Sequence, residues 1–206
     1  MRTSTATTPG NPTQSVAPLK LLVILGSTRQ GRASERFGEW VMEAANDDTR
    51  FETELIDLRD WDLPLLDVEQ PPSAGGYSEA SKRFGQKIEG ADAYLIVTPE
   101  YNHGVSAVLK NALDSVYHEW NEKAVGFVSY GAGAGGARAV EHLKQITNWL
   151  RLAPVPNGLH VIHYYKQSME EIKEQYGREL GPILDDLARW GGAMRHLRQS
   201  NPRQKK

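Results

Sequence analysis

The chain has 206 residues, a formal net charge of -2 and no cysteine. This length suits one domain with a substantial core, and the charge gives no basic field to attract nucleic acid. The lack of cysteine excludes disulfides, zinc–thiolate sites and thiol catalysis. No apolar run approaches the roughly 20 residues of a membrane span, and no apolar signal region is present, so we expect a cytoplasmic protein.

The two ends of the chain differ from the rest in composition. Residues 1–18 are rich in Thr, Pro, Ser and Gly, with too little apolar surface to offset the cost of ordering. We interpret them as a disordered tail, with a transit peptide as the weaker alternative. Residues 198–206 form a basic C-terminal tail, interpreted as a solvated end. A single domain is therefore expected over residues 19–197.

The first structured unit is predicted to be a strand, a polar loop and a helix. Residues 20–25 are aliphatic and stop at Gly26, as expected for a strand buried on both faces. Hydroxyl and arginine side chains follow, and apolar residues then recur at helical spacing from Phe37 to Ala44. Backbone N–H groups at a helix start are unpaired and attract anions. This loop therefore predicts an anion site.

Further strands are predicted over residues 51–58, 93–98 and 123–130, and a short fifth strand is predicted in the segment 154–162, placed at residues 160–164. Helices are predicted over residues 78–90, 105–116, 139–150 and 168–197, the last of them broken near Gly177, Gly181 and Pro182.

A long loop over residues 59–77 separates the second strand from the next helix. Connections of this length are usually functional or form a contact surface. Trp61, Leu63, Leu65 and Leu66 are too apolar for a free loop. We expect them to pack on their own domain or on a second subunit.

Strands and helices alternate, which predicts an α/β three-layer sandwich with a five-stranded parallel sheet and helices on both faces. In such sheets ligands bind beyond the carboxyl ends of the strands. Three loops of unusual composition leave strand ends, at residues 27–34, 99–104 and 131–136. Their convergence is the main functional signal, and the alternative is that all three are ordinary turns.

The first loop favours a terminal phosphate. It lacks the Gly-x-Gly start of a dinucleotide fingerprint and the Gly-Lys-Ser/Thr end of a P-loop. Ser27, Thr28 and Ser34 offer hydroxyl groups instead, and Arg29 and Arg32 offer charge. Such charge-assisted donors suit a phosphate with three free oxygens.

The third loop matches Gly-x-Gly-x-x-Gly at Gly131, Gly133 and Gly136. A Rossmann site also needs an acidic residue about 20 positions further on, and residues 151–169 contain none. We interpret the loop as a backbone donor beside a flat ligand. A pyrophosphate site and a plain flexible turn stay open as alternatives.

The second loop brings Tyr101, Asn102 and His103 to the same edge. Backbone N–H and C=O groups there can form hydrogen bonds with the edge of a planar ring. Glu100 is either a ligand group or a helix cap, and His103 is either an edge donor or a surface histidine. Together the three loops describe a mononucleotide site with a flat head group, which FMN fits.

No metal site is expected. His160 and His163 lie three apart on a predicted strand and so face opposite sides.

The chain also resembles the NADPH-dependent FMN reductase family, whose fold is flavodoxin-like. The resemblance spans about residues 19–195. It is carried by Gly-Ser-Thr-Arg-Gln-Gly-Arg at 26–32, Thr-Pro-Glu-Tyr-Asn at 98–102, Leu-Lys-Asn-Ala-Leu-Asp at 109–114, Ser-Tyr-Gly at 129–131 and Gly-Gly-Ala-Arg at 135–138.

The resemblance implies three groups of FMN-binding residues. The phosphate loop comprises Ser27, Arg29, Gln30, Arg32 and Ser34. The loop along the isoalloxazine edge comprises Pro99, Glu100, Tyr101, Asn102 and His103. The loop beside the ring comprises Ser129, Tyr130, Gly131 and Gly133. Many members have Ser and Asn where this chain has Arg32 and Ser34, which leaves the contacts of these two residues open. For Tyr101 and Tyr130, a purely structural role is the alternative to ligand binding.

The implied activity is that of an FMN-dependent NAD(P)H oxidoreductase. NADPH or NADH reduces FMN, which then reduces a quinone, a free flavin, an azo compound or a metal ion by a ping-pong scheme. No catalytic side chain is expected, because the flavin carries the chemistry. Homodimers or homotetramers are implied, in which the second subunit forms part of the wall of the ligand cleft. The apolar residues of the 59–77 loop are the candidates for that wall. A flavodoxin-like electron carrier needing a partner reductase, and an NADP sensor without flavin, stay open.

Overall fold

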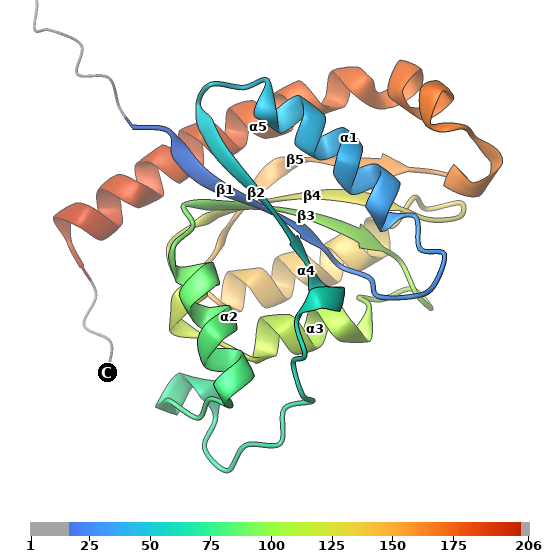
Figure 1. Cartoon of the computed structure of the whole chain (residues 1–206). Coiled ribbons are helices and arrows are strands. Elements are labelled where there is room, and N and C mark those ends of the chain that lie inside the picture. Colours follow the sequence, from blue (N-terminus) through green and yellow to red (C-terminus); the bar gives the residue numbers. More distant parts are fainter. Residues whose placement is uncertain (1–16, 203–206) are drawn as a thin grey trace, which may run out of the picture.

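Five parallel strands form one sheet of order β2-β1-β3-β4-β5 (Figure 1). The computed structural model describes residues 17–202, so the tail expected over residues 1–18 lies almost wholly outside the described residues. The strands are β1 (Leu19–Leu25), β2 (Phe51–Asp57), β3 (Ala93–Pro99), β4 (Ala124–Tyr130) and β5 (Ala153–Val161). This sheet confirms the predicted flavodoxin-like α/β fold.

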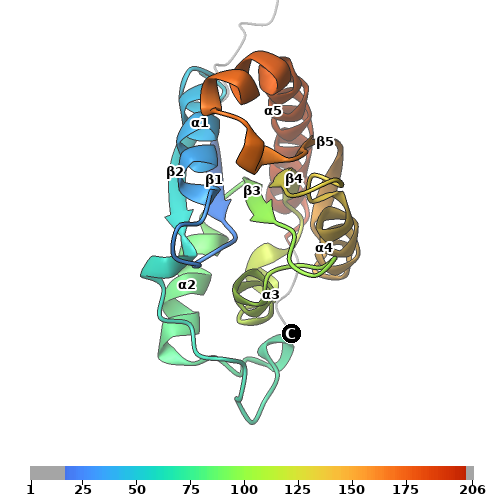
Figure 2. The same ribbon diagram turned by 90° about the vertical axis from the view of Figure 1, so that its right-hand side faces the viewer.

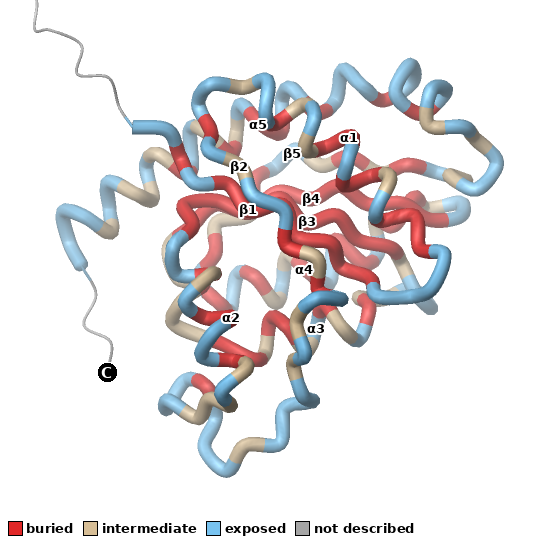
Figure 3. The backbone as a smooth tube through the Cα atoms, in the orientation of Figure 1, coloured by how far each residue is buried: buried red, intermediate tan, exposed pale blue. Residues whose placement is uncertain are grey.

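Helices cover both faces of the sheet (Figures 1 and 2). They are α1 (Ser34–Asn46), α2 (Glu79–Glu89), α3 (Ala107–Asp114), α4 (Ala137–Trp149) and α5 (Met169–Ser200). Helices α1 and α5 lie on one face, and α2, α3 and α4 lie on the other. Side chains alternate along β1, so that Leu21 and Val23 join the α1/α5 core while Leu22 and Ile24 join the second core. The three central strands, β1, β3 and β4, are consequently almost wholly buried (Figure 3).

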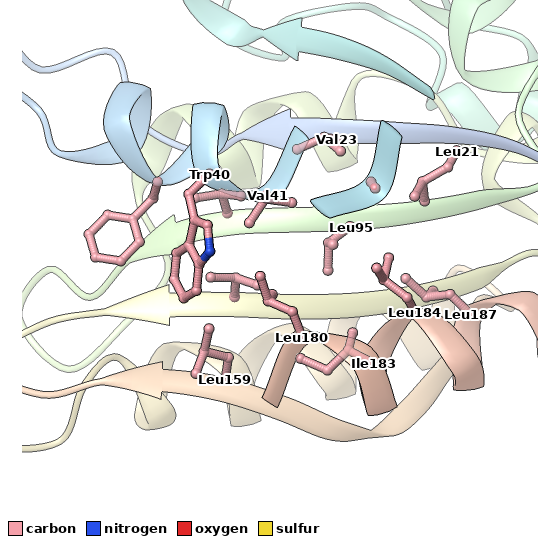
Figure 4. Packing of buried hydrophobic residues seen from close by; sticks show 14 of the residues in the cluster. Leu21, Val23, Trp40, Val41, Leu95, Leu159, Leu180, Ile183, Leu184 and Leu187 are labelled. Carbon is pink, nitrogen blue, oxygen red and sulfur yellow. The ribbon is translucent and has the colours of Figure 1, made fainter. Parts of the chain in front are cut away.

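The core beneath α1 and α5 is built from helical stripes that cover the central strands (Figure 4). Trp40 and Val41 of α1 contribute to it, as do Leu180, Ile183, Leu184 and Leu187 of α5. The α5 residues recur at i, i+3, i+4 and i+7, one face of a helix. This packing fixes both helices relative to the sheet.

The fifth strand lies earlier in the sequence than expected. It runs from Ala153 to Val161, which agrees with the predicted segment 154–162, whereas the narrower placement at residues 160–164 was wrong. Its two prolines, Pro154 and Pro156, are tolerated because β5 is an edge strand. The Ala153 N–H donates inward to the Lys123 carbonyl at 2.8 Å, so the nitrogen of Pro154 faces outward. Pro156 lies where the register with β4 shifts between Val125 and Phe127, and proline is also tolerated at such an irregularity.

The turn after β5 also corrects the expectation for the two histidines. The chain leaves the strand at Val161 and turns at His163, whose φ is +48°. His160 and His163 therefore do not share a strand.

The last helix is continuous where a break was expected. Helix α5 passes through Gly177, Gly181 and Pro182 and ends at Ser200. Its buried stripe packs on the sheet, and this tertiary packing outweighs the local cost of a helical proline, about 3 kcal/mol. None of the helices within residues 17–202 has the length and apolar character needed to cross a membrane.

An ion cluster at the amino edge of the sheet anchors the end of α5. Asp92 accepts hydrogen bonds from the Lys20 backbone N–H at 3.0 Å, from Arg195 at 2.7 Å and from Arg198 at 2.6 Å. Burial alone would raise the pKa of Asp92, but the bonds from Arg195 and Lys20 lower it below its ordinary value of 3.8. The cluster therefore favours the ionised carboxylate.

We predict that Asp92→Asn destabilises the fold by about 2–3 kcal/mol at pH 7, because two arginines lose a charged acceptor. Because the pKa of Asp92 is lower in the folded state, its carboxylate stabilises the fold above pH 3.8. This stabilisation is lost as the pH falls through the pKa that Asp92 has in the folded protein. Urea unfolding from pH 7 to pH 2.5 should show the gap between wild type and variant closing below pH 3.8. Asp114→Asn, which removes an exposed bond to Lys110, is the control and should cost under about 0.5 kcal/mol. A gap that stays constant over this pH range would contradict the prediction.

Candidate functional site

Three loops meet where β1, β3 and β4 end, at the edge that faces the viewer in Figure 2. These strands are adjacent and parallel, so their carboxyl ends lie side by side. The loops are also tied together by side chains. Ser106 at the start of α3 donates to the Gly26 carbonyl at 2.5 Å, and Ser27 shares a 2.8 Å hydrogen bond with the Tyr101 hydroxyl. The expected site residues all lie on this edge.

Arg29 is the exposed cation of the first loop. Its hydrogen bond with Tyr101 raises the pKa of its guanidinium further above the ordinary value. The Tyr101 hydroxyl thus meets both Ser27 and Arg29. No carboxylate within residues 17–202 forms an ion pair with Arg29, which leaves its charge available to an anion.

Arg32 lies on the opposite side of this loop from the expected anion. Its side chain is only 1% exposed. The guanidinium contacts both oxygens of Asp57, one oxygen of Glu35 and the Ser27 carbonyl. This arrangement argues against the direct phosphate contact that the sequence led us to expect.

Helix α1 begins without a side-chain cap. Its N-cap residue is Ala33, which offers no acceptor to the first-turn N–H groups. Ser34 follows, fully buried, and its hydroxyl has no partner among the described residues. Donors at this helix start are therefore available to an anion.

Tyr130 points from the end of β4 toward this helix start. Its ring stacks on Phe37 with centroids 4.7 Å apart, and the ring of Tyr164 packs edge-on against it. Burial, opposed by the neighbouring Ser34 hydroxyl, raises the pKa of the Tyr130 phenol. The phenol also lacks a hydrogen-bond partner within the described residues, so Tyr130 is a neutral wall of the site at physiological pH.

The second loop is a tight turn clamped to α4. Tyr101 and Gly104 exchange backbone hydrogen bonds at 3.1 and 3.0 Å, with positive φ at Asn102 and His103. The Glu100 carboxylate accepts from the Arg138 backbone N–H at 3.2 Å and from its side chain at 2.6 Å. Of the two interpretations of Glu100, the structure supports the cap, although the capped helix is α4. Pro99, the last residue of β3, pairs with Tyr130.

The glycine loop is explained by its own packing. Gly135 and Gly136 have φ of +59° and +90°, values that favour glycine. A Cβ on Gly136 would lie 2.7 Å from the Ser129 Cβ, and one on Gly135 would lie 2.8 Å from His160 backbone atoms. Ser129 in turn donates to the Gly135 carbonyl and bonds His160 Nδ1 at 2.7 Å. The loop thus runs so close to β4 and β5 that only glycine fits at these two positions, and no pyrophosphate is needed to explain them.

Several residues that shape this edge were not predicted from the sequence. Asp57 is the last residue of β2 and Arg59 lies just beyond it, and Ser106 and His160 hold neighbouring loops. The polar run after the second predicted strand was a usable signal, because β2 ends beside β1. The roles of Ser106 and His160 depend on pairings between distant segments.

The fold and this edge define a class: flavodoxin-like α/β proteins that bind a ligand at the carboxyl ends of their strands. The model of the NADPH-dependent FMN reductase family matches residues 19–167. An NAD(P)H-dependent FMN reductase from Schizosaccharomyces pombe is 38% identical over 189 residues, 90% of this chain and 94% of that protein. The chain therefore belongs to the NADPH-dependent FMN reductase family and is an oxidoreductase.

Other relatives are quinone reductases. An NAD(P)H:quinone oxidoreductase from Solanum tuberosum is 36% identical, over 65% of this chain and 70% of that protein. Among solved structures, the flavoenzyme FerB from Paracoccus denitrificans superposes with a TM-score of 0.65 at 21% identity, covering 85% of this chain and 98% of its own. At that identity the similarity concerns the fold alone.

We predict that Gly136→Ala destabilises the protein by about 2 kcal/mol, because it adds a contact with Ser129 to a strained backbone. Gly133→Ala is the matched control, since a Cβ there meets nothing closer than His163 at 4.0 Å. Urea unfolding of both variants measures the difference. Equal losses in the two variants would show that packing against Ser129 is not what requires glycine.

Proposed function

We propose that the chain is an FMN-dependent NAD(P)H oxidoreductase with FMN held at the carboxyl edge of β1, β3 and β4. The observation that carries the proposal is the first loop, where Arg29 lacks a carboxylate partner among the described residues and α1 starts uncapped. These donors suit the phosphate of FMN. Family membership supports this proposal over an electron carrier and over a sensor without flavin.

The proposed contacts follow the three loops. Ser27, Arg29, Gln30 and Ser34 surround the phosphate. Backbone groups of Pro99 to His103 lie along the ring edge, and those of Ser129 to Gly133 lie beside the ring. The Glu100–Arg138 clamp holds the second loop against α4, so both ring-contacting loops are positioned before a ligand arrives.

FMN, when bound, supplies the ring that accepts hydride from NAD(P)H and passes electrons to a second substrate. The protein's part is to bind, orient and exclude water. Backbone N–H groups near the ring stabilise negative charge there. No side chain is assigned as acid or base, because burial raises the pKa of Tyr130 and makes it a weak proton donor at neutral pH.

A quinone is the proposed second substrate, with free flavins, azo compounds and metal ions as further acceptors in a ping-pong scheme. The potato relative is an NAD(P)H:quinone oxidoreductase, and a Burkholderia relative, 28% identical, is a 2-hydroxy-1,4-benzoquinone reductase. The cytoplasmic location expected from the sequence stays a prediction.

A homodimer or homotetramer is also proposed, with the 59–77 loop at the contact. Trp61 and Leu63 pack on the core of their own domain, whereas Leu65 is 78% and Leu66 47% exposed. Two adjacent exposed leucines suit a surface covered by a second copy. Sedimentation of the purified protein as a monomer at micromolar concentration would contradict this.

The proposed function is tested on the purified protein loaded with FMN. We expect an absorbance band near 450 nm that bleaches under NADPH without oxygen and returns when benzoquinone is added. Steady NADPH oxidation with the quinone should need no other protein. A band that NADPH does not bleach would overturn the proposal.

We further predict that Arg29→Ala weakens FMN binding by about 1–3 kcal/mol, the usual loss for a charge-assisted hydrogen bond. Titration of the apoprotein, followed by flavin fluorescence, gives the Kd. Riboflavin, which has no phosphate, is the control ligand and should bind both proteins equally. An unchanged Kd for FMN would place the phosphate elsewhere.

A further inference from the structure

The guanidinium of Arg32 is fully used by the protein itself. Arginine has five N–H donors. Nε donates to Glu35 at 3.2 Å, one terminal nitrogen donates to Asp57 at 2.7 Å and to the Ser27 carbonyl, and the other donates to Glu35 at 3.0 Å and to Asp57. No donor remains for a ligand. The sequence placed Arg32 on the phosphate loop, but the structure gives it a different task there.

A second arginine binds a carbonyl of the same loop, two residues after Ser27. Arg59, which follows β2, donates to the Arg29 carbonyl at 3.3 Å and to Glu35 at 3.0 Å. The carbonyls of Ser27 and Arg29 are thus each bound by an arginine side chain, one from within the loop and one from beyond β2. Both arginines share the Glu35 carboxylate, so they act as one network with Asp57.

Holding these carbonyls orients the next N–H groups. The C=O and N–H of a trans peptide point in opposite directions, and no cis peptide occurs within the described residues. The N–H groups of Thr28 and Gln30 therefore face away from the two arginines. Neither has an acceptor among residues 17–202. Two unpaired N–H donors on one side of a loop form an anion-binding concavity.

The charges of the network cancel. Arg32 and Arg59 are balanced by Asp57 and Glu35, all within 3.2 Å contacts. Arg29 stays as the unbalanced charge beside the exposed N–H groups. The network consequently fixes the conformation of the loop, and Arg29 supplies the positive charge that attracts an anion.

We propose that Arg32, together with Asp57, Glu35 and Arg59, is a positioning residue that sets the phosphate-binding conformation of the 27–34 loop without touching the phosphate. The proposal rests on the proposed function, because it concerns how this site takes the phosphate monoester of FMN. A preformed loop spares the ligand the cost of ordering it. Lysine cannot replace Arg32, since a single ammonium cannot reach Ser27, Glu35 and Asp57 in this fork geometry.

The test compares Arg32→Lys, Arg32→Gln and Arg29→Lys by FMN titration over a range of NaCl concentrations. For both Arg32 variants we expect the Kd of FMN to rise about tenfold while its salt dependence stays that of wild type, because the phosphate keeps its cation. Arg29→Lys should keep most of the affinity, since a point charge still serves there. Rescue of binding by Arg32→Lys, or a weaker salt dependence in Arg32→Gln, would mean that Arg32 contacts the phosphate and would overturn the proposal.

A milder variant guards against loss of the fold. Arg59→Gln removes the bond to the Arg29 carbonyl at a side chain that is 43% exposed, and we expect its Kd for FMN to rise about threefold with an unchanged melting temperature. Arg50→Gln, which breaks an ion pair with Asp185 away from the loop, is the matched control and should leave binding unchanged. Wild-type affinity in Arg59→Gln would overturn the proposal. Wild-type protein that binds no FMN would overturn the proposed function as well, which separates the two failures.

Discussion

The parallel pairing of β1 with both β2 and β3 is the constraint on which the site depends. Leu25, the last residue of β1, is level with Asp57 on one side and with Val97 on the other. Every segment that leaves these strands therefore starts at the same edge. This register lets Arg32 reach Asp57 and lets Ser27 meet Tyr101. A shift of one residue would turn the buried side chains of β1 to the wrong faces.

The loops at this edge are held by contacts on the side away from the proposed ligand. Arginines bind the carbonyls of the first loop, Glu100 joins the second loop to α4, and Ser129 joins the third loop to β5. Such a scaffold fits an oxidoreductase whose reactive group is a bound flavin, because the protein then contributes orientation more than reactive side chains. The aromatic stack of Phe37, Tyr130 and Tyr164 closes the space between α1 and β4.

Hydrophobic pattern predicted the fold, because buried parallel strands are short aliphatic runs that end at glycine or proline, as the strands before Gly26 and at Pro99 show. It found a fifth strand in the segment 154–162 but narrowed it to the wrong end, because Pro154 and Pro156 are tolerated in an edge strand and only the strand order shows that β5 is one. It also predicted a break in α5, which packing on the sheet overrides. Local pattern does not contain either constraint.

The meeting of the three loops followed from the sequence more readily than the direction of their side chains. The polar loop before α1 was found, and Ser27, Arg29 and Tyr101 do meet there. Arg32 is only three residues from Arg29, yet its side chain faces the other way, because Asp57 is supplied by a strand 25 residues away. Contacts between distant segments decide which of two similar arginines is free.

The two prolines of β5, Pro154 and Pro156, bear on how copies of this chain meet. A further strand adding to β5 needs N–H donors along its outer edge, and proline has none. At the opposite border of the sheet, β2 carries the charged Glu52 and Glu54, which disfavour continuous pairing in the same way. Fibre-like stacking through the sheet is thus blocked at both borders, and orderly association is left to helices and loops.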